Sequence, residues 1–265
     1  MTMITSRQNP KIRQIRALKH RKARQETGLF LVEGLHATGS AMEAGAPIEY
    51  LCYSPEKLSS EYGANLVAAL TAQGIPCLAV SEDVFELLAE KENPQGILAV
   101  VRQQRRQLAD FNRENFPWGV ALVAPQDPGN LGTILRTVDA AGASGVIILD
   151  KGVEIYHPKA VRASMGALFW RPVIRAAFDE FSQWAKANDY TLYGSSAKRG
   201  RSLEAAESFR RPAILLLGSE REGLSREQAE VCNEIIQLPM QGQVTSLNLS
   251  VAAGILLYAM RETIT

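Results

Sequence analysis

The chain has 265 residues, of which 46% are hydrophobic and 22% charged, with a formal net charge of +1. This composition is typical of a soluble globular protein that forms one large domain or two smaller ones. The three cysteines stand far apart, which excludes a paired redox or metal motif, and the charged start excludes a secretory signal. The longest apolar run is too short for a membrane span. We therefore expect a cytoplasmic protein.

The positive charge is concentrated at the start of the chain. Residues 1–24 hold eight Lys and Arg and no acid, whereas the remainder carries a net charge of −7. A basic segment on a mildly acidic body predicts contact with a polyanion. A solvated amphipathic helix explains the segment equally well, because Ile12, Ile15 and Leu18 keep a helical spacing. The basic residues that we single out as RNA contacts are Lys19, Arg21, Lys22 and Arg24.

The front of the chain predicts alternating helices and strands. The expected helices are 6–24, 35–44, 62–73 and 84–89, and the expected strands are 28–34, 48–53, 76–80 and 97–101. Asn9 or Ser6 is the expected cap of the first helix, with Pro10 in its first turn. A polar, arginine-rich stretch follows and predicts a linker. We place the first domain at 1–105, the linker at 106–117 and a second domain at 118–265.

The second domain repeats this alternation. Its expected strands are 119–124, 145–149, 171–174, 191–195, 213–217 and 234–238, and its expected helices are 131–141, 158–165, 178–188, 226–232 and 249–260. The strand at 213–217 has no polar alternation, as is typical of a strand buried on both faces. The domain therefore predicts an α/β fold with a mostly parallel sheet and helices on both faces. Ligands of such sheets bind outside the carboxyl ends of the strands.

Three polar loops follow three of these strands. The loop at 125–130 leads into a helix, with Asn130 as the expected N-cap and Arg136 inside the helix. Arg136 is either an ordinary exposed helix arginine or a side chain directed at phosphate or ribose.

The second loop, 218–225, starts at a glycine and presents Glu220 as a hydrogen-bond acceptor. The third loop, 238–248, presents Ser246 and Asn248, either of which is also a plausible cap of the last helix.

The usual nucleotide and catalytic signatures are missing. The sequence contains neither G-x-G-x-x-G after the first strand of either domain nor G-x-x-x-x-G-K-[ST]. The three histidines lack metal-ligand spacing, so we expect no metal. The residues alone therefore predict a ligand site made by three loops, together with a basic arm, and leave the reaction open.

Together the three loops resemble the three motifs of the SpoU/TrmH family of RNA ribose 2′-O-methyltransferases, in the SPOUT class. The matching segments are Asn130-Leu-Gly-Thr-Ile-Leu-Arg136, Leu217-Gly-Ser-Glu-Arg-Glu-Gly-Leu-Ser225 and Leu238-Pro-Met-Gln-Gly-Gln-Val-Thr-Ser-Leu-Asn-Leu-Ser-Val-Ala-Ala253. Segment 158–169 is also similar to the family. The segment Phe30-Leu-Val-Glu-Gly34 resembles the ribosomal-protein-like substrate-binding domain of ribosomal RNA members, which implicates Glu33 in RNA binding.

The resemblance implies a deep trefoil knot in the C-terminal domain, a homodimer, and S-adenosylmethionine as methyl donor. It implies that Leu217, Gly218, Leu238, Met240 and Leu247 surround the cofactor. It also implies that Arg136, Asn130, Glu220, Ser246 and Asn248 form the catalytic group. A guanidinium is a poor base in proteins, so we expect Arg136 to hold phosphate.

Ribosomal RNA is the expected substrate, because a front domain of this size suits a folded RNA. The alternatives are a transfer RNA methyltransferase, a non-catalytic RNA-binding protein of the same fold, and a nucleotide-dependent oxidoreductase. The missing glycine fingerprint disfavours the last of these.

Overall fold

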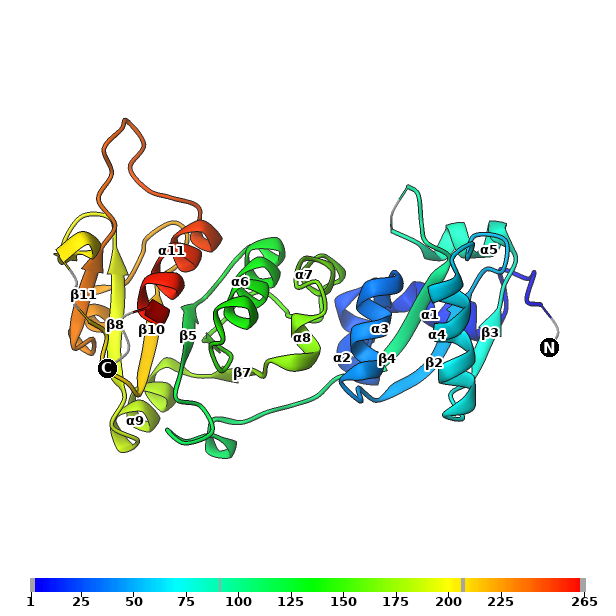
Figure 1. Ribbon diagram of the computed structural model, residues 1–265, viewed down its shortest axis with the longest axis horizontal. Helices are drawn as coiled ribbons and strands as arrows, with labels where there is room; N and C mark the ends of the chain where they lie inside the picture. Colours follow the sequence, from blue (N-terminus) through cyan, green and yellow to red (C-terminus); the bar gives the residue numbers. More distant parts are fainter. Residues whose placement is uncertain (1–2, 91, 206–207, 263–265) are drawn as a thin grey trace. The chain divides into compact units, whose positions relative to one another are not determined.

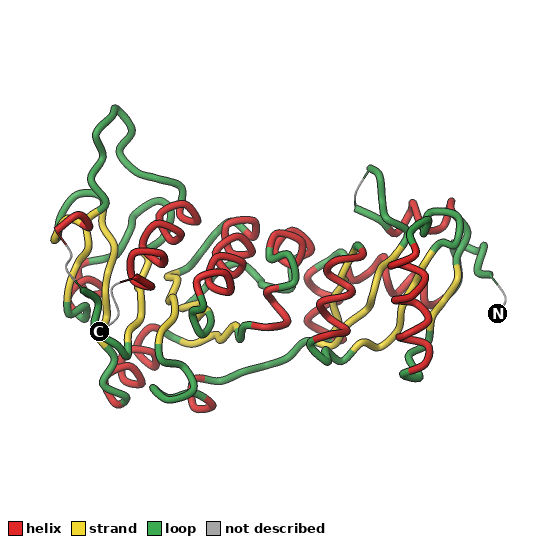
Figure 2. The backbone as a smooth tube through the Cα atoms, in the orientation of Figure 1, coloured by secondary structure: helices red, strands yellow, loops and turns green. Residues whose placement is uncertain are grey.

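A computed structural model describes residues 3–90, 92–205 and 208–262. The chain divides into two compact units. The first comprises the described part of Met1–Gln104 together with Tyr156–Phe169, and the second comprises Arg105–Ile155 with the described part of Trp170–Thr265. Segment 156–169 lies inside the domain that we placed at 118–265, yet it packs with the front unit. Figure 2 shows helices alongside the strands of each unit.

The front unit is built on a four-stranded sheet of order β1-β4-β2-β3, in which only β2 and β3 are parallel. Its elements are α1 (Pro10–Leu18), α2 (Arg21–Thr27), β1 (Leu29–Glu33), α3 (Leu35–Glu43), β2 (Ile48–Tyr53), α4 (Glu61–Ala72), β3 (Cys77–Ala79), α5 (Glu82–Leu88), β4 (Ile97–Arg102) and α7 (Pro158–Ala163). The helix expected at 158–165 is confirmed as α7, and a further short helix, α8 (Ala167–Trp170), follows it after a break. The break falls at Met165 and Gly166, which both have positive φ.

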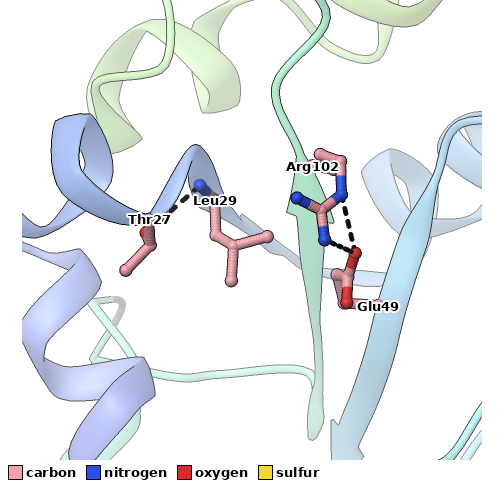
Figure 3. Close-up of polar contacts among 4 residues, drawn as sticks. All are labelled: Thr27, Leu29, Glu49 and Arg102. Carbon is pink, nitrogen blue, oxygen red and sulfur yellow. Dashed lines mark hydrogen bonds and ion pairs between the residues drawn. The ribbon is translucent and has the colours of Figure 1, made fainter.

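The basic start forms two helices instead of the single helix expected at 6–24. Asn9 caps α1 by accepting a hydrogen bond from the N–H of Lys11, and Pro10 occupies the first turn, as expected. Gly28 ends α2 in the left-handed conformation. The hydroxyl of Thr27 then accepts a hydrogen bond from the N–H of Leu29 where β1 begins (Figure 3).

The two central strands of the front sheet are joined by an ion pair. Arg102 at the end of β4 donates through Nε and Nη2 to Oε1 of Glu49 on β2 (Figure 3). Because Glu49 lies opposite the end of β4, this contact secures the point at which the chain leaves the front sheet.

The second unit is a seven-stranded sheet in which every neighbouring pair is parallel, in the order β7-β6-β5-β10-β8-β11-β9. Its elements are η1 (Leu108–Asp110), β5 (Trp118–Val123), α6 (Pro128–Ala141), β6 (Val146–Leu149), β7 (Val173–Ala176), α9 (Phe178–Ala187), β8 (Thr191–Ser196), β9 (Arg201–Ser202), η2 (Leu203–Ala205), β10 (Ala213–Leu217), α10 (Arg226–Glu230), β11 (Glu234–Gln237) and α11 (Leu249–Glu262). The predicted parallel sheet is confirmed. The short strand β9 was not expected.

Helices cover both faces of this sheet, as predicted. On one face, Phe181 and Ala185 of α9 pack against alternate residues of the strands, including Ile147 and Ile214. On the other, α11 lies alongside α6 (Figure 1), and it also contacts β10. Alternate side chains of a strand point to opposite faces, which explains why the strands are apolar throughout. The trefoil knot implied by the resemblance stays a prediction.

No helix among the described residues is long and apolar enough to cross a membrane.

Candidate functional site

The second unit has one point at which the order of its strands reverses. From β5 the chain passes through α6 to β6 and β7 on one side, whereas β10, β8 and β11 lie on the other. In open α/β sheets, ligands bind outside the carboxyl ends of the strands at such a point. The three predicted loops follow β5, β10 and β11, so this topology places all of them at the same edge of the sheet.

Helix α6 begins earlier than expected. Asp127 is its N-cap, because its carboxylate accepts a 2.8 Å hydrogen bond from the N–H of Asn130, and Pro128 occupies the first turn. The prediction that Asn130 caps the helix is therefore wrong. Because Asp127 does the capping, the Asn130 side-chain amide is left to make other contacts.

Glu220 reaches the start of α6 from the loop after β10. Both of its carboxylate oxygens accept 3.2 Å hydrogen bonds from the N–H of Gln126, and one also accepts a 3.4 Å bond from the N–H of Asp127. These are backbone donors just ahead of a helix, where partial positive charge stabilises an anion. Glu220 therefore ties the second loop to the first.

The Asn130 side chain joins the third loop to the other two. Its Nδ2 donates to Oε1 of Glu220 at 3.5 Å, and its Oδ1 accepts a 3.0 Å bond from Nδ2 of Asn248. Asn248 immediately precedes α11. Three residues from three separate segments thus meet at one amide, which we call the Asn130 junction: Asn130, Glu220 and Asn248.

Ser250, in the first turn of α11, fixes the orientation of the Asn248 side-chain amide. Its N–H and its hydroxyl both donate to Oδ1 of Asn248, at 2.8 and 2.7 Å. Because that oxygen accepts both bonds, the amide nitrogen of Asn248 faces Asn130. Ser250 was not predicted from the sequence; the signal was a hydroxyl residue two positions after an asparagine at a helix start.

Two predicted catalytic residues lie away from the junction. Arg136 is exposed, six residues further along α6 than Asn130 and therefore about 9 Å along the helix axis. Within the part of the chain that the structure describes, its guanidinium makes no hydrogen bond or ion pair. Ser246 lies in the exposed loop before α11. The fold therefore leaves both side chains accessible to a bound molecule.

The predicted cofactor residues follow β10 and β11. Leu217 and Leu238 are buried, whereas Leu247 is exposed. Gly218 permits a tight turn, because a Cβ there would come within 2.0 Å of the backbone of Gly223. Ser219 and Gly223 exchange two backbone hydrogen bonds across this turn. A side chain at Gly218 would therefore displace the loop that carries Glu220.

The described residues contain neither an activated thiol nor a metal site. Burial raises the pKa of Cys52 to about 12 and that of Cys232 to about 11, so both thiols are protonated at neutral pH. Residues 3–90, 92–205 and 208–262 contain no group of three or more His, Cys, Asp or Glu side chains arranged to hold a metal.

The basic arm of the front unit divides into structural and exposed residues. Arg24 is only 1% exposed and donates to the carbonyls of Leu18 and Lys19 at the end of α1. Lys19 donates to the carbonyls of Leu87 and Ala89 at the end of α5. The prediction that Arg24 contacts RNA is therefore corrected: its guanidinium is buried and stabilises a helix end.

Other bases of this arm are exposed. Arg21 and Lys22 are exposed, and so are Arg13 and Arg16, which line an open recess of about 410 Å³ on α1. Lys22 forms only a solvent-exposed 3.8 Å pair with Glu26, which contributes little. These four residues form the basic face of the arm.

Glu33 has a structural partner in the front unit. Its Oε2 accepts a 3.0 Å hydrogen bond from the N–H of Glu90, while its Oε1 is buried and makes no hydrogen bond among the described residues. The same side chain lines a small pocket with Arg162. RNA binding by Glu33 stays a prediction.

These features define a class of α/β protein. It has a parallel unit with a three-loop site at its switch point, preceded by a small α/β unit with a basic face. Residues 117–258 match the SpoU rRNA Methylase family, and residues 9–99 match the MRM3-like substrate binding domain. The chain belongs to the SpoU rRNA methylase family. The predicted family is confirmed.

Relatives of this family align over almost the whole chain. The 23S rRNA (guanosine(2553)-2′-O)-methyltransferase RlmP of Bacillus subtilis is 33% identical over 98% of this chain and 100% of its own length. The AdoMet-bound rRNA methyltransferase of Sinorhizobium meliloti is 34% identical, with a TM-score of 0.89 over 98% of this chain and 97% of its own. The SpoU methyltransferase AviRb of Streptomyces viridochromogenes, solved with AdoMet, is 30% identical, with a TM-score of 0.85 over 96% and 98%.

Proposed function

We propose that this protein transfers a methyl group from S-adenosylmethionine to a ribose 2′-hydroxyl of ribosomal RNA. The observation that carries the proposal is the Asn130 junction, in which all three family motifs meet at the switch point of the sheet. Two relatives whose names are 23S rRNA 2′-O-methyltransferases support the proposed substrate. A similar rRNA methyltransferase solved with AdoMet supports the proposed cofactor.

The residues at the carboxyl ends of β10 and β11 fit this cofactor. Leu217 and Leu238 supply apolar side chains, and the loops that follow supply peptide groups and exposed polar side chains. A binding site for an adenosine needs this combination of apolar walls and a few directed polar groups. When bound, the cofactor supplies an activated methyl group. The residues that would hold the cofactor are Leu217, Gly218, Leu238, Met240 and Leu247.

Arg136 is assigned to the RNA. Methyl transfer requires the 2′-hydroxyl to be aligned with the methyl donor at near contact, and an anchored phosphate fixes the ribose. Arg136 is exposed and makes no hydrogen bond or ion pair among the described residues, and arginine binds phosphate in a bidentate manner. Its fixed charge also favours the ionised form of a nearby hydroxyl. The Asn130 junction then holds the start of α6, and with it the arginine.

A second copy of the chain is the partner that fits α11. Val251, Ile255 and Tyr258 lie at helical spacing on α11 and are 49%, 42% and 41% exposed. Exposed apolar side chains that line one face of a helix mark an interaction surface. We propose that this α11 face pairs with itself in a symmetric homodimer, in which each residue of the face is buried twice.

Methylation mapping tests the proposed function directly. Ribosomal RNA from a strain that lacks this gene should lose one or more ribose methyl groups, and the purified protein with S-adenosylmethionine should restore them. Calorimetry with the cofactor separates an enzyme from a non-catalytic RNA-binding protein, which should give no heat. An unchanged methylation map and a failure to label the RNA would together refute the proposal.

Replacing Ser250 with alanine should lower kcat by roughly 3- to 10-fold, because one hydrogen bond that orients Asn248 is lost and a net hydrogen bond is worth about 1 kcal/mol. Threonine should restore the rate, since it keeps the hydroxyl. Ser60→Ala removes a helix-capping hydroxyl from α4 in the front unit and serves as the control. If both alanine variants lose stability and neither loses kcat, Ser250 has only a capping role.

Replacing both Arg21 and Lys22 with alanine should flatten the salt dependence of RNA binding. Each phosphate contact contributes about 0.7–0.9 to the slope of log K against log salt, so the slope should fall by about 1–2. Filter binding between 50 and 200 mM salt measures it. Lys186→Ala, an exposed base at the end of α9, is the control. An unchanged slope would mean that α2 is ordinary surface.

A further inference from the structure

A second depression opens at the same edge of the parallel sheet, on the far side of β5 from the Asn130 junction. It is shallow and open, with a volume of about 700 Å³. It lies at the carboxyl ends of β5, β6 and β7 and at the first turn of α9. Its lining residues are Ala124, Asp150, Lys151, Arg175, Ala176, Ala177 and Glu180.

The walls of the depression are held in place by its own loops. Ala124 and Asp150, directly after β5 and β6, both have positive φ, which L-residues rarely adopt. Oδ1 of Asp150 accepts a 2.9 Å bond from the N–H of Phe178 at the start of α9. Arg175 donates through Nη2 to the carbonyls of Gly152 and Val153. The turn conformations and the contacts thus fix the loops after β6 and β7.

Two charged groups on the rim remain available. Lys151 and Glu180 are both exposed, and neither makes a hydrogen bond or ion pair with any residue that the structure describes. The lining also includes three alanines, Ala124, Ala176 and Ala177, so part of it is small and apolar. An ammonium and a carboxylate are therefore presented beside an apolar surface.

This combination fits a nucleobase better than a phosphate. The lining carries two cations and two carboxylates, and carboxylates repel a phosphate. Single-stranded RNA is read by packing the flat face of a base and by hydrogen bonds to its edges. Among the RNA bases, guanine presents two adjacent N–H donors for one carboxylate, next to a carbonyl oxygen that accepts from a lysine.

The depression also lies at the same edge of the sheet as the proposed reaction site. Neighbouring strands are about 4.8 Å apart, so β6 and β7 lie within about 10 Å of β5, from which α6 continues.

Resting on the proposed function, we propose that this depression binds a guanine base of the RNA, at or directly beside the nucleotide whose ribose is methylated. Glu180 accepts from the ring and exocyclic N–H groups, and Lys151 donates to the carbonyl oxygen. The three alanines contact the face of the ring.

Base substitution in a short RNA that carries the mapped nucleotide tests this proposal. Guanine is replaced by adenine or by hypoxanthine at the methylated position and at each neighbour. The wild-type protein should prefer guanine at one of these positions by roughly 5- to 100-fold in kcat/KM, the range of a good bidentate base contact. Glu180→Gln and Lys151→Ala should lower kcat/KM on the guanine RNA and abolish the preference, with cofactor affinity unchanged.

Asp179→Asn and Lys186→Ala provide matched controls, since both residues are exposed on α9 and neither lines the depression. A guanine preference that persists in Glu180→Gln and Lys151→Ala would overturn the proposal, and so would the absence of such a preference in the wild type.

Failure of the proposed function is a separate outcome, in which the wild type methylates no RNA. Backbone amide resonances then test the depression by itself. Titration with guanosine should shift the signals of Lys151 and Ala177, and titration with adenosine should not. Equal shifts, or none, would overturn the proposal.

Discussion

Replacing Arg136 with alanine is expected to lower kcat by roughly 10²- to 10⁴-fold while leaving S-adenosylmethionine affinity almost unchanged. The side chain is exposed and has no hydrogen-bonded partner among the described residues, so its removal costs the fold little. The loss arises because the ribose is no longer held in line and the hydroxyl loses a neighbouring positive charge. Single-turnover methylation and calorimetry with the cofactor measure the two quantities separately.

Lysine at position 136 distinguishes two roles for this side chain. It keeps the charge and loses the bidentate geometry, so a phosphate clamp predicts an intermediate rate. A lysine variant as slow as the alanine variant would show that the planar guanidinium is required. Methylation of the mapped RNA at the wild-type rate by Arg136→Ala would remove the residue from the mechanism.

Replacing Ile255 with glutamate is expected to convert the proposed dimer into monomers and to abolish methylation. In a symmetric interface the new carboxylate is buried twice without a partner, and an unpaired buried charge costs several kcal/mol. Because 1.4 kcal/mol corresponds to a tenfold change in affinity, the dimer should dissociate at least roughly 100-fold more readily. Sedimentation velocity across a concentration series measures this change.

Ala187→Glu places the same charge at an exposed position on α9 and should leave the dimer intact. A point substitution is preferable to deletion of 250–265, because that segment includes Leu256 and Leu257 of the core. If Ile255→Glu is monomeric but binds cofactor with wild-type affinity, the dimer contact and the cofactor site are independent. If it remains dimeric, the α11 face is not the interface.

Much of the fold could be predicted from local patterns. The apolar run at 213–217 indicated a strand buried on both faces, and helices alternate with the strands, so a parallel sheet followed. Pro10, Asn9 and Gly28 mark helix ends through their own backbone chemistry. Three ordered motifs were specific enough to identify the family.

Errors arose where two neighbouring signals competed. Asp127 and Asn130 are both good capping residues, and Pro128 decides between them because it favours the first turn of a helix. Arg24 lies in a basic segment typical of RNA contacts, yet its guanidinium donates hydrogen bonds to the carbonyls at the end of α1. Short-range pattern does not reveal which polar group a folded chain turns inward, because the partner lies in another element.

The sequence by itself determined the parallel sheet, the basic arm and the three loops, since each depends on residues close together in the chain. Only the tertiary structure decided how those loops meet. Glu220 and Asn248 follow Asn130 by 90 and 118 positions. Their hydrogen bonds to Asn130 exist because the order of strands brings β5 and β10 together and returns the chain from β11 to the same edge. The depression at Lys151 and Glu180 has the same origin, because its walls come from three strand ends that are adjacent only in the folded sheet.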